Sequence, residues 1–230
     1  GGLQTALQLR AMRRTLGTDA PLRTMQVTFM APVPPGKVQI EVRVLRAGKS
    51  ATHVESRIHN GKELAAVVIG VFGVARESVV QVELACPPAS KTPEQCIEAP
   101  YIAGLVPAFL QHTQMRWVHG AVPFSGTPET KAQIYLRFAR DPVVTEATIL
   151  GLADIIAPLG LSFLKKFAPG SSMTWALDLL SHDFPQGDGW WRVDSELSSA
   201  RDGYSSQTTT LYSPAGKAIA LSRQAMVVFG

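Results

Sequence analysis

An internal duplication constrains the fold of this 230-residue chain more than any other feature of its sequence. Two glycines 13 residues apart, Gly48 and Gly61, recur 155 positions later as Gly203 and Gly216. A lysine follows the second glycine of each pair, and both halves finish with the tripeptide Val-Phe-Gly. The chain therefore contains two similar units, and each must bury a similar pattern of apolar residues.

The first unit has the pattern of one helix followed by an antiparallel meander. Between Leu3 and Leu16 apolar residues recur at intervals of three and four, which predicts an amphipathic helix that Gly17 ends. The period then changes to two, which predicts strands over 22–31, 38–45, 54–58 and 64–72. Asn60-Gly61 is typical of a tight hairpin turn between the last two strands.

The second unit repeats this order after a linker. Its pattern predicts a helix over 143–159, two strands before it (115–122, 132–138) and four after it (173–180, 190–195, 204–212, 218–229). We assign 1–82 to the first unit, 83–105 to the linker and 106–230 to the second unit. We expect the first unit to lack its leading strand and a native segment to precede Gly1.

This order predicts an α+β fold of the kind called a double hotdog. Each of its two tandem units is a long helix wrapped by an antiparallel sheet, since a helix flanked by such strands must bury its apolar stripe against the sheet. Two such units pair edge to edge, which removes exposed strand edges.

Composition narrows the class of protein. With 46% hydrophobic and 17% charged residues, the chain can form a large core without disulfides or a structural metal, so we predict that Cys86 and Cys96 are reduced thiols in a cytoplasmic protein. A net charge of +4 with scattered basic residues disfavours nucleic-acid binding. The apolar stretch 147–164 contains Asp154 and Pro158, which favours a helix buried in a soluble domain over insertion in a membrane.

Several common enzyme motifs are missing. The sequence has no G-x-S-x-G elbow, no G-x-G-x-x-G after a strand and no G-x-x-x-x-G-K-[ST] loop, which disfavours α/β serine hydrolases, dinucleotide enzymes and NTPases. Its five histidines show no ligand spacing on a helix, so we expect no metal site and no cofactor.

The remaining candidates for a functional site are polar residues in apolar surroundings. Asp154 stands among leucines and isoleucines on a helix that must be buried, so its carboxylate must face a cavity, be hydrogen-bonded or be used in catalysis. Gln224 shares a strand face with apolar residues, although a solvent-facing glutamine is the simpler interpretation. Asp178 and His182 lie four apart on one predicted strand and could form an acid/base pair for enoyl-thioester hydration, but roughly 13 Å would separate them.

Several segments, in order and spacing, resemble the acyl-CoA thioesterase II (TesB-like) family. The matching segments are Gly1–Leu7, Phe29–Pro32, Val44–Ser50, His59–Lys62, Leu150–Asp154, Thr174 with His182 eight residues later, and Ala220–Gln224. The resemblance covers most of the chain and fails over 75–115. In that family an Asp, a Thr and a Gln hold the hydrolytic water, and these match Asp154, Thr174 and Gln224. The loop at Gly170 is one residue shorter than the family pattern, which leaves Ala176 as the alternative match for the Thr.

The resemblance implies that the protein hydrolyses fatty acyl-CoA thioesters to free acid and CoA. Asp154 would deprotonate a water that Thr174 and Gln224 fix, and backbone N–H groups near Gly1-Gly2 would stabilise the oxyanion. The acyl chain would lie in a tunnel between helix and sheet, and the chains would form a homodimer. The alternatives are a non-catalytic acyl-thioester binding protein and an enoyl-thioester hydratase-like enzyme.

Overall fold

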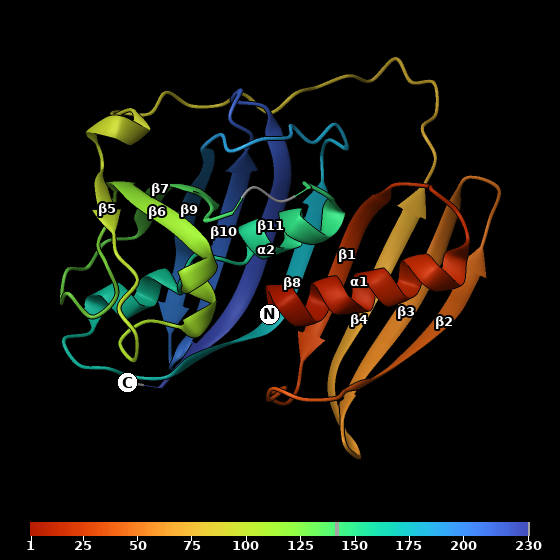
Figure 1. The fold of residues 1–230 in the computed structure, drawn as a ribbon, viewed down its shortest axis with the longest axis horizontal. Coiled ribbons are helices and arrows are strands. Elements are labelled where there is room, and N and C mark those ends of the chain that lie inside the picture. The colour runs from red at the N-terminus through yellow and green to blue at the C-terminus, as the bar shows by residue number, and fades with distance from the viewer. Residues whose placement is uncertain (141–142, 230) are drawn as a thin grey trace.

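One continuous antiparallel sheet of eleven strands forms the body of the protein (Figure 1). The structure is a computed structural model that describes residues 1–140 and 143–229. The first unit contributes four strands, β1 (Leu22–Phe29), β2 (Gln39–Ala47), β3 (Ala51–Asn60) and β4 (Glu63–Gly73). The rest of the described chain contributes seven, β5 (Ile97–Ala99), β6 (Thr113–His119), β7 (Lys131–Phe138), β8 (Gly170–Leu179), β9 (Trp191–Arg201), β10 (Tyr204–Tyr212) and β11 (Ala218–Val228).

The strand order repeats on the two sides of a central pair. The order across the sheet is β2-β3-β4-β1-β8-β11-β10-β9-β7-β6-β5, and β1 pairs with β8 from Thr24–Asp178 to Thr28–Thr174. Moving outward from that pair, β1, β4, β3 and β2 on one side correspond to β8, β11, β10 and β9 on the other. The duplication in the sequence is therefore a duplication of topology, and the predicted double hotdog is confirmed.

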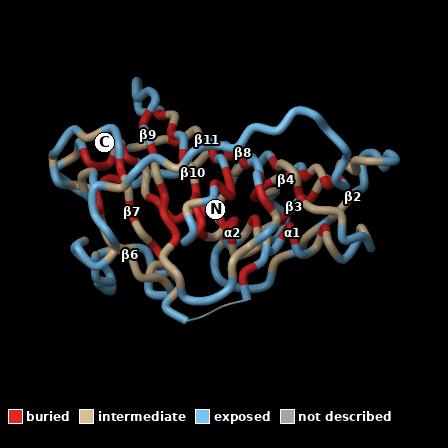
Figure 2. The backbone as a smooth tube through the Cα atoms, turned by 90° about the horizontal axis from the view of Figure 1, so that it is seen from above, coloured by how far each residue is buried: buried red, intermediate tan, exposed pale blue. Residues whose placement is uncertain are grey.

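Within the described residues, two α-helices lie on one face of this sheet, α1 (Gly2–Leu16) and α2 (Glu146–Ala153) (Figure 1). Each helix presents apolar side chains to the sheet, including Leu9 and Met12 of α1 and Leu150 and Leu152 of α2, and all four are buried. Figure 2 shows that the buried stretches of backbone lie in the interior, on the strands and helices themselves, and that exposed stretches lie at the periphery. Three short 3-10 helices, η1 (Pro93–Gln95), η2 (Ala108–His112) and η3 (Leu159–Phe163), occur in the connections.

Helix α2 is shorter than the sequence predicts at both ends. Thr145 caps its start in a reciprocal capping box with Thr148, which fixes the first turn at Glu146 instead of residue 143. The helix ends at Ala153 with Asp154 at its C-cap, and it could not have run on to residue 159, because Pro158 has no N–H donor and disfavours helical geometry at Ala157. The prediction of a helix to residue 159 was therefore wrong, and Asp154 caps the helix end instead of lying within it.

The connection between the units crosses the outer face of the sheet over the strands of the second unit. Residues 74–92 form no helix or strand, but side chains of the second unit hold the later part of this segment. Arg192 Nη2 donates a hydrogen bond of 2.7 Å to the Pro87 carbonyl, and the Tyr135 hydroxyl donates one of 3.1 Å to the Lys91 carbonyl. β5 lies inside the range predicted as linker and pairs with β6. Within the described ranges, no helix has the length and apolar character needed to span a membrane.

Candidate active site

Asp154, Gln224 and Ser172 form a hydrogen-bonded cluster where α2 ends. The Gln224 side-chain amide donates to Asp154 Oδ1 at 2.9 Å, and the Ser172 hydroxyl donates to Gln224 Oε1 at 2.9 Å. The backbone N–H of Gly2, at the start of α1, donates to Asp154 Oδ2. Side chains from α2, β11 and β8 thus converge with the first turn of α1. We call Asp154, Gln224 and Ser172 the Asp-Gln-Ser cluster.

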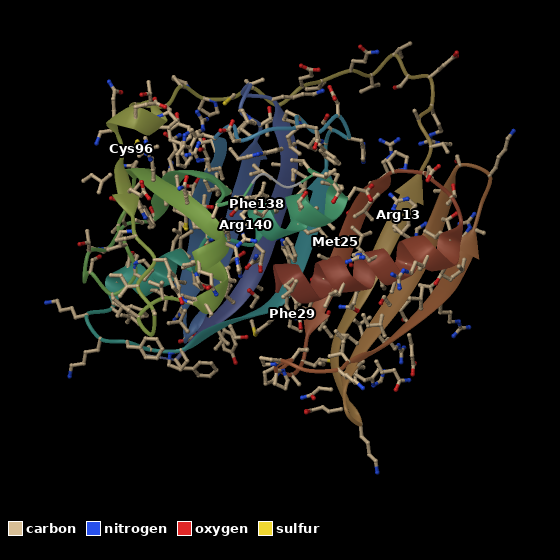
Figure 3. All side chains as sticks on the ribbon, in the orientation of Figure 1. Arg13, Met25, Phe29, Cys96, Phe138 and Arg140 are labelled. Atoms are coloured by element: carbon tan, nitrogen blue, oxygen red, sulfur yellow. The ribbon has the colours of Figure 1, made fainter. Side chains whose placement is uncertain are left out.

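The start of α1 can approach Asp154 because its first two residues are glycines. A Cβ added at Gly2 would lie 3.0 Å from Asp154 Cβ, and one added at Gly1 would lie 3.0 Å from both Asp154 Oδ2 and Phe29 Cζ. Phe29 is at the end of β1 that lies near the start of α1 (Figure 3). The first N–H groups of a helix have no acceptor within it and carry partial positive charge. Asp154 therefore faces a set of donors that suits an anion.

A β-bulge in β8 brings Ser172 into the cluster. Thr174 pairs with Ala225 of β11, whereas Ser172 pairs with the next residue, Met226, so that Met173 is an extra residue in β8. This extra residue reverses the alternation of side chains, and Ser172 faces inward with the buried Trp175 and Met226. The sequence gives no signal for this bulge, which is why Ser172 was missed.

Thr174, which the family resemblance matched to the water site, is not in the cluster. It is exposed on the outer face of the sheet, directly next to the buried Trp175. The alternative match, Ala176, is also exposed. Successive residues of a strand point to opposite faces, so neither position reaches Asp154 through the sheet. The structure therefore unites two of the three residues expected from the sequence, Asp154 and Gln224.

Gln224 is buried on the inner face of β11, with only 6% of its surface exposed. Ala220, Ser222 and Met226 are buried on the same face, while Leu221 and Arg223 are exposed. The solvent-facing interpretation of Gln224 was therefore wrong. Gln224 is paired on this inner face, and so is Gln207, which accepts the Leu159 N–H at 2.8 Å.

The other acid/base candidates, Asp178 and His182, are not brought together. Asp178 is exposed between Leu177 and Leu179, which are both buried, so it points to the outer face. His182 lies beyond the end of β8, and its Nε2 is 2.7 Å from the Leu22 carbonyl oxygen. This arrangement does not support an acid/base pair for hydration.

Two cavities lie away from the Asp-Gln-Ser cluster. One of about 400 Å³ is lined by Arg13, Glu146 and His182, among others. The second, of about 630 Å³, lies on the second unit and is lined in part by Pro87 and Asp194. Burial raises the pKa of the Asp194 carboxyl, although Arg192 beside it opposes this. Among the residues that the structure describes, no three His, Cys, Asp or Glu side chains are grouped to hold a metal ion.

Models of known protein families show which family the chain belongs to. A model of the acyl-CoA thioesterase N-terminal domain matches residues 1–73, and a model of the acyl-CoA thioesterase C-terminal domain matches residues 93–228. The chain belongs to the acyl-CoA thioesterase family. This thioesterase is a thioester hydrolase, as the resemblance of its sequence implied.

Solved structures share the fold of this thioesterase over its whole length. A hotdog-fold protein of unknown function from Alicyclobacillus acidocaldarius superposes with a TM-score of 0.89 at 21% identity, covering 100% of this chain and 87% of the other. A tesB protein of Mycobacterium avium subspecies paratuberculosis gives 0.80 at 16% identity, with coverages of 100% and 87%. An acyl-CoA thioesterase II of Mycobacterium marinum gives 0.81 at 15% identity, with coverages of 100% and 89%. None of the curated proteins compared with the chain matches its sequence significantly.

Proposed function

We propose that this thioesterase hydrolyses acyl-CoA thioesters to free acid and CoA by direct attack of a water held at the Asp-Gln-Ser cluster. The observation that supports this most is the position of the Asp154 carboxylate, which lies just beyond the C-terminal end of α2 and accepts hydrogen bonds from Gln224 and from the start of α1. Each carboxylate oxygen can accept a further hydrogen bond, so Asp154 can also bind a water. A basic group beside helix N–H donors suits both the activation of water and the charge that forms on the carbonyl.

The reaction follows from these positions. Asp154 takes a proton from the water as the water oxygen bonds to the thioester carbon, and negative charge develops on the carbonyl oxygen. N–H groups in the first turn of α1 stabilise that charge. The carbon–sulfur bond then breaks, and the proton held by Asp154 passes to the departing CoA thiolate. Gln224 fixes the plane of the carboxylate, and Ser172 in turn fixes the Gln224 amide.

A comparison of Ser172→Ala with Thr174→Ala tests which hydroxyl serves the site. Ser172→Ala leaves Gln224 Oε1 without its donor, and we expect kcat to fall by about tenfold to a hundredfold, the rate equivalent of one hydrogen bond to a buried polar group. Thr174→Ala removes a hydroxyl on the outer face and is expected to keep kcat within about twofold of wild type. Release of the CoA thiol from an acyl-CoA measures both rates. The opposite order of effects would contradict the role of Ser172.

The alternative function, binding of acyl thioesters without cleavage, predicts a different outcome when the protein is mixed with acyl-CoA. It would bind acyl-CoA stoichiometrically, and thiol release would not exceed the spontaneous rate. The convergence of Asp154 and Gln224 favours hydrolysis, because a binding site for an apolar acyl chain has no need of a carboxylate beside helix N–H donors. Initial rates of thiol release across acyl-CoAs of graded chain length therefore test the proposed function.

A further inference from the structure

The largest fully buried side chain in the described structure, Trp175, lies beside the Asp-Gln-Ser cluster. It faces Gln224 directly across the β8–β11 pair and Val27 across the β1–β8 pair. Side chains that face each other across an antiparallel pair have Cβ atoms about 4.5–5.5 Å apart. Only 1% of the Trp175 surface is exposed. The indole is therefore an immediate neighbour of Gln224 on the inner face.

A hydrogen bond fixes the direction of the indole. Its Nε1 donates to the Ser222 hydroxyl at 2.7 Å, in a fully buried contact. Ser222 precedes Gln224 by two residues on the inner face of β11, whereas Met226, which faces Ser172, follows Gln224 by two. The ring thus extends from Gln224 away from Ser172, across roughly 7 Å of the inner face that two strand residues span.

The surroundings of the Asp-Gln-Ser cluster limit where the acyl chain of a bound substrate can lie. The CoA moiety is polar and charged and must stay in water, so the apolar acyl chain is the part that leaves solvent. The apolar neighbours of Gln224 on the inner face are Trp175 and Met226, with Val27 beyond Trp175, and all three are buried, whereas the neighbour on the β10 side is the polar Gln207. If the thioester carbonyl is at Asp154 and the acyl chain passes between α2 and the sheet, the acyl chain meets the indole within roughly 7 Å, the length of two strand residues.

We propose that Trp175 closes the acyl pocket directly beyond the Asp-Gln-Ser cluster and so makes this thioesterase selective for short acyl chains. The hydrogen bond to Ser222 holds the ring in the closing position. This inference rests on the proposed function, since it places the scissile carbonyl at Asp154. It adds the class of substrate, a short-chain acyl-CoA, and names the side chain that excludes longer ones.

The test measures kcat/KM for acetyl-, butyryl-, hexanoyl-, octanoyl-, lauroyl- and palmitoyl-CoA. We expect wild type to prefer butyryl-CoA over lauroyl-CoA by about tenfold or more, because misfit of a few methylenes in an apolar pocket has at least that effect. Trp175→Leu opens the pocket and should raise the lauroyl-to-butyryl ratio by about tenfold. Trp175→Phe, which disturbs packing less, should shift the ratio in the same direction by a smaller factor.

Trp191→Leu is the matched control. Trp191 is also on the inner face, with 2% of its surface exposed. Its replacement by Leu removes the same atoms as Trp175→Leu. Gln207 of β10 pairs with Gln224 on one side and with Leu197 of β9 on the other, so Leu197 is level with the cluster. Trp191 lies six residues from Leu197 along β9, which is roughly 20 Å of strand. We expect its lauroyl-to-butyryl ratio to equal that of wild type. Thermal melts of all variants show which of them are folded.

The outcomes separate the two proposals. If wild type hydrolyses all chain lengths equally, or if neither Trp175 variant changes the ratio, the role of Trp175 is overturned while the proposed function stands. If no acyl-CoA is hydrolysed, the proposed function fails, and binding of S-alkyl-CoA thioethers of graded length tests the pocket by itself. About tenfold tighter binding of a dodecyl thioether to Trp175→Leu than to wild type would then support the pocket, and equal binding would overturn it.

Discussion

Replacement of Asp154 by Asn is expected to lower kcat for thioester hydrolysis by about two to four orders of magnitude. Asn matches Asp in size and can still accept the Gly2 N–H through its carbonyl oxygen. It cannot take a proton from water, and its NH2 group cannot accept the hydrogen bond that Gln224 donates to Asp154 Oδ1. The variant therefore keeps the shape of the site and removes its base. Continuous measurement of CoA thiol release gives the rate.

Asp178→Asn provides the control for this experiment. Asp178 is an exposed carboxylate on the outer face of β8, and its loss should leave kcat within about twofold of wild type. This variant also tests the hydratase interpretation, in which Asp178 would be essential. Near wild-type turnover by Asp154→Asn would remove Asp154 from the mechanism, and a large loss in Asp178→Asn would favour the other carboxylate.

Replacement of Glu146 by Ala is expected to lower the free energy of unfolding by about 2–4 kcal/mol. The Glu146 carboxylate accepts two hydrogen bonds of 2.6 Å from Arg13 Nη2 and one of 2.8 Å from the Leu22 N–H. It thereby joins the first turn of α2 to α1 and β1, and both side chains of the ion pair are mostly buried. Without Glu146, the Nε and Nη2 groups of Arg13 and the Leu22 N–H lose their acceptor. Urea denaturation followed by circular dichroism measures the change.

Glu196→Ala is the matched change at an exposed pair. Glu196 lies 3.6 Å from Lys131, and both side chains are more than half exposed. Solvent screens such pairs, so we expect a loss of about 0–1 kcal/mol. Equal destabilisation by the two variants would show that the Arg13–Glu146 pair contributes no more than a surface contact and would contradict its role in joining the helices.

Much of the fold could be predicted because periodicity and duplication report on burial directly. β10 was predicted over its observed bounds, Tyr204–Tyr212, and the repeated glycines anticipated the repeated strand order. Helix α2 was predicted too long because an apolar run of this kind fits a buried helix and a buried irregular segment equally well. The segment after Asp154 is irregular, and its apolar residues Ile155 and Ile156 are buried without being helical.

Only part of the candidate site could be predicted from the sequence. The physical reason for each success or failure differs from residue to residue. Asp154 stood out because a carboxylate among apolar residues needs a partner, and the structure supplies Gln224 and the start of α1. Gln224 was noted because it shares a strand face with apolar residues, but its role at a water site came only from the family resemblance, and a solvent-facing side chain was the simpler interpretation. Ser172 was missed because one extra residue in β8 reverses which side chains face inward, and strict alternation cannot show an insertion.

We propose that this thioesterase cleaves short acyl-CoA thioesters with a water held at Asp154. The most direct measurement follows free CoA thiol and free butyric acid together after purified protein is mixed with butyryl-CoA. We predict that the two products form in equal amounts and far faster than in buffer, and that Asp154→Asn slows the formation of both by about two to four orders of magnitude. Thiol release no faster than in buffer, or release of thiol without the acid, would contradict the account.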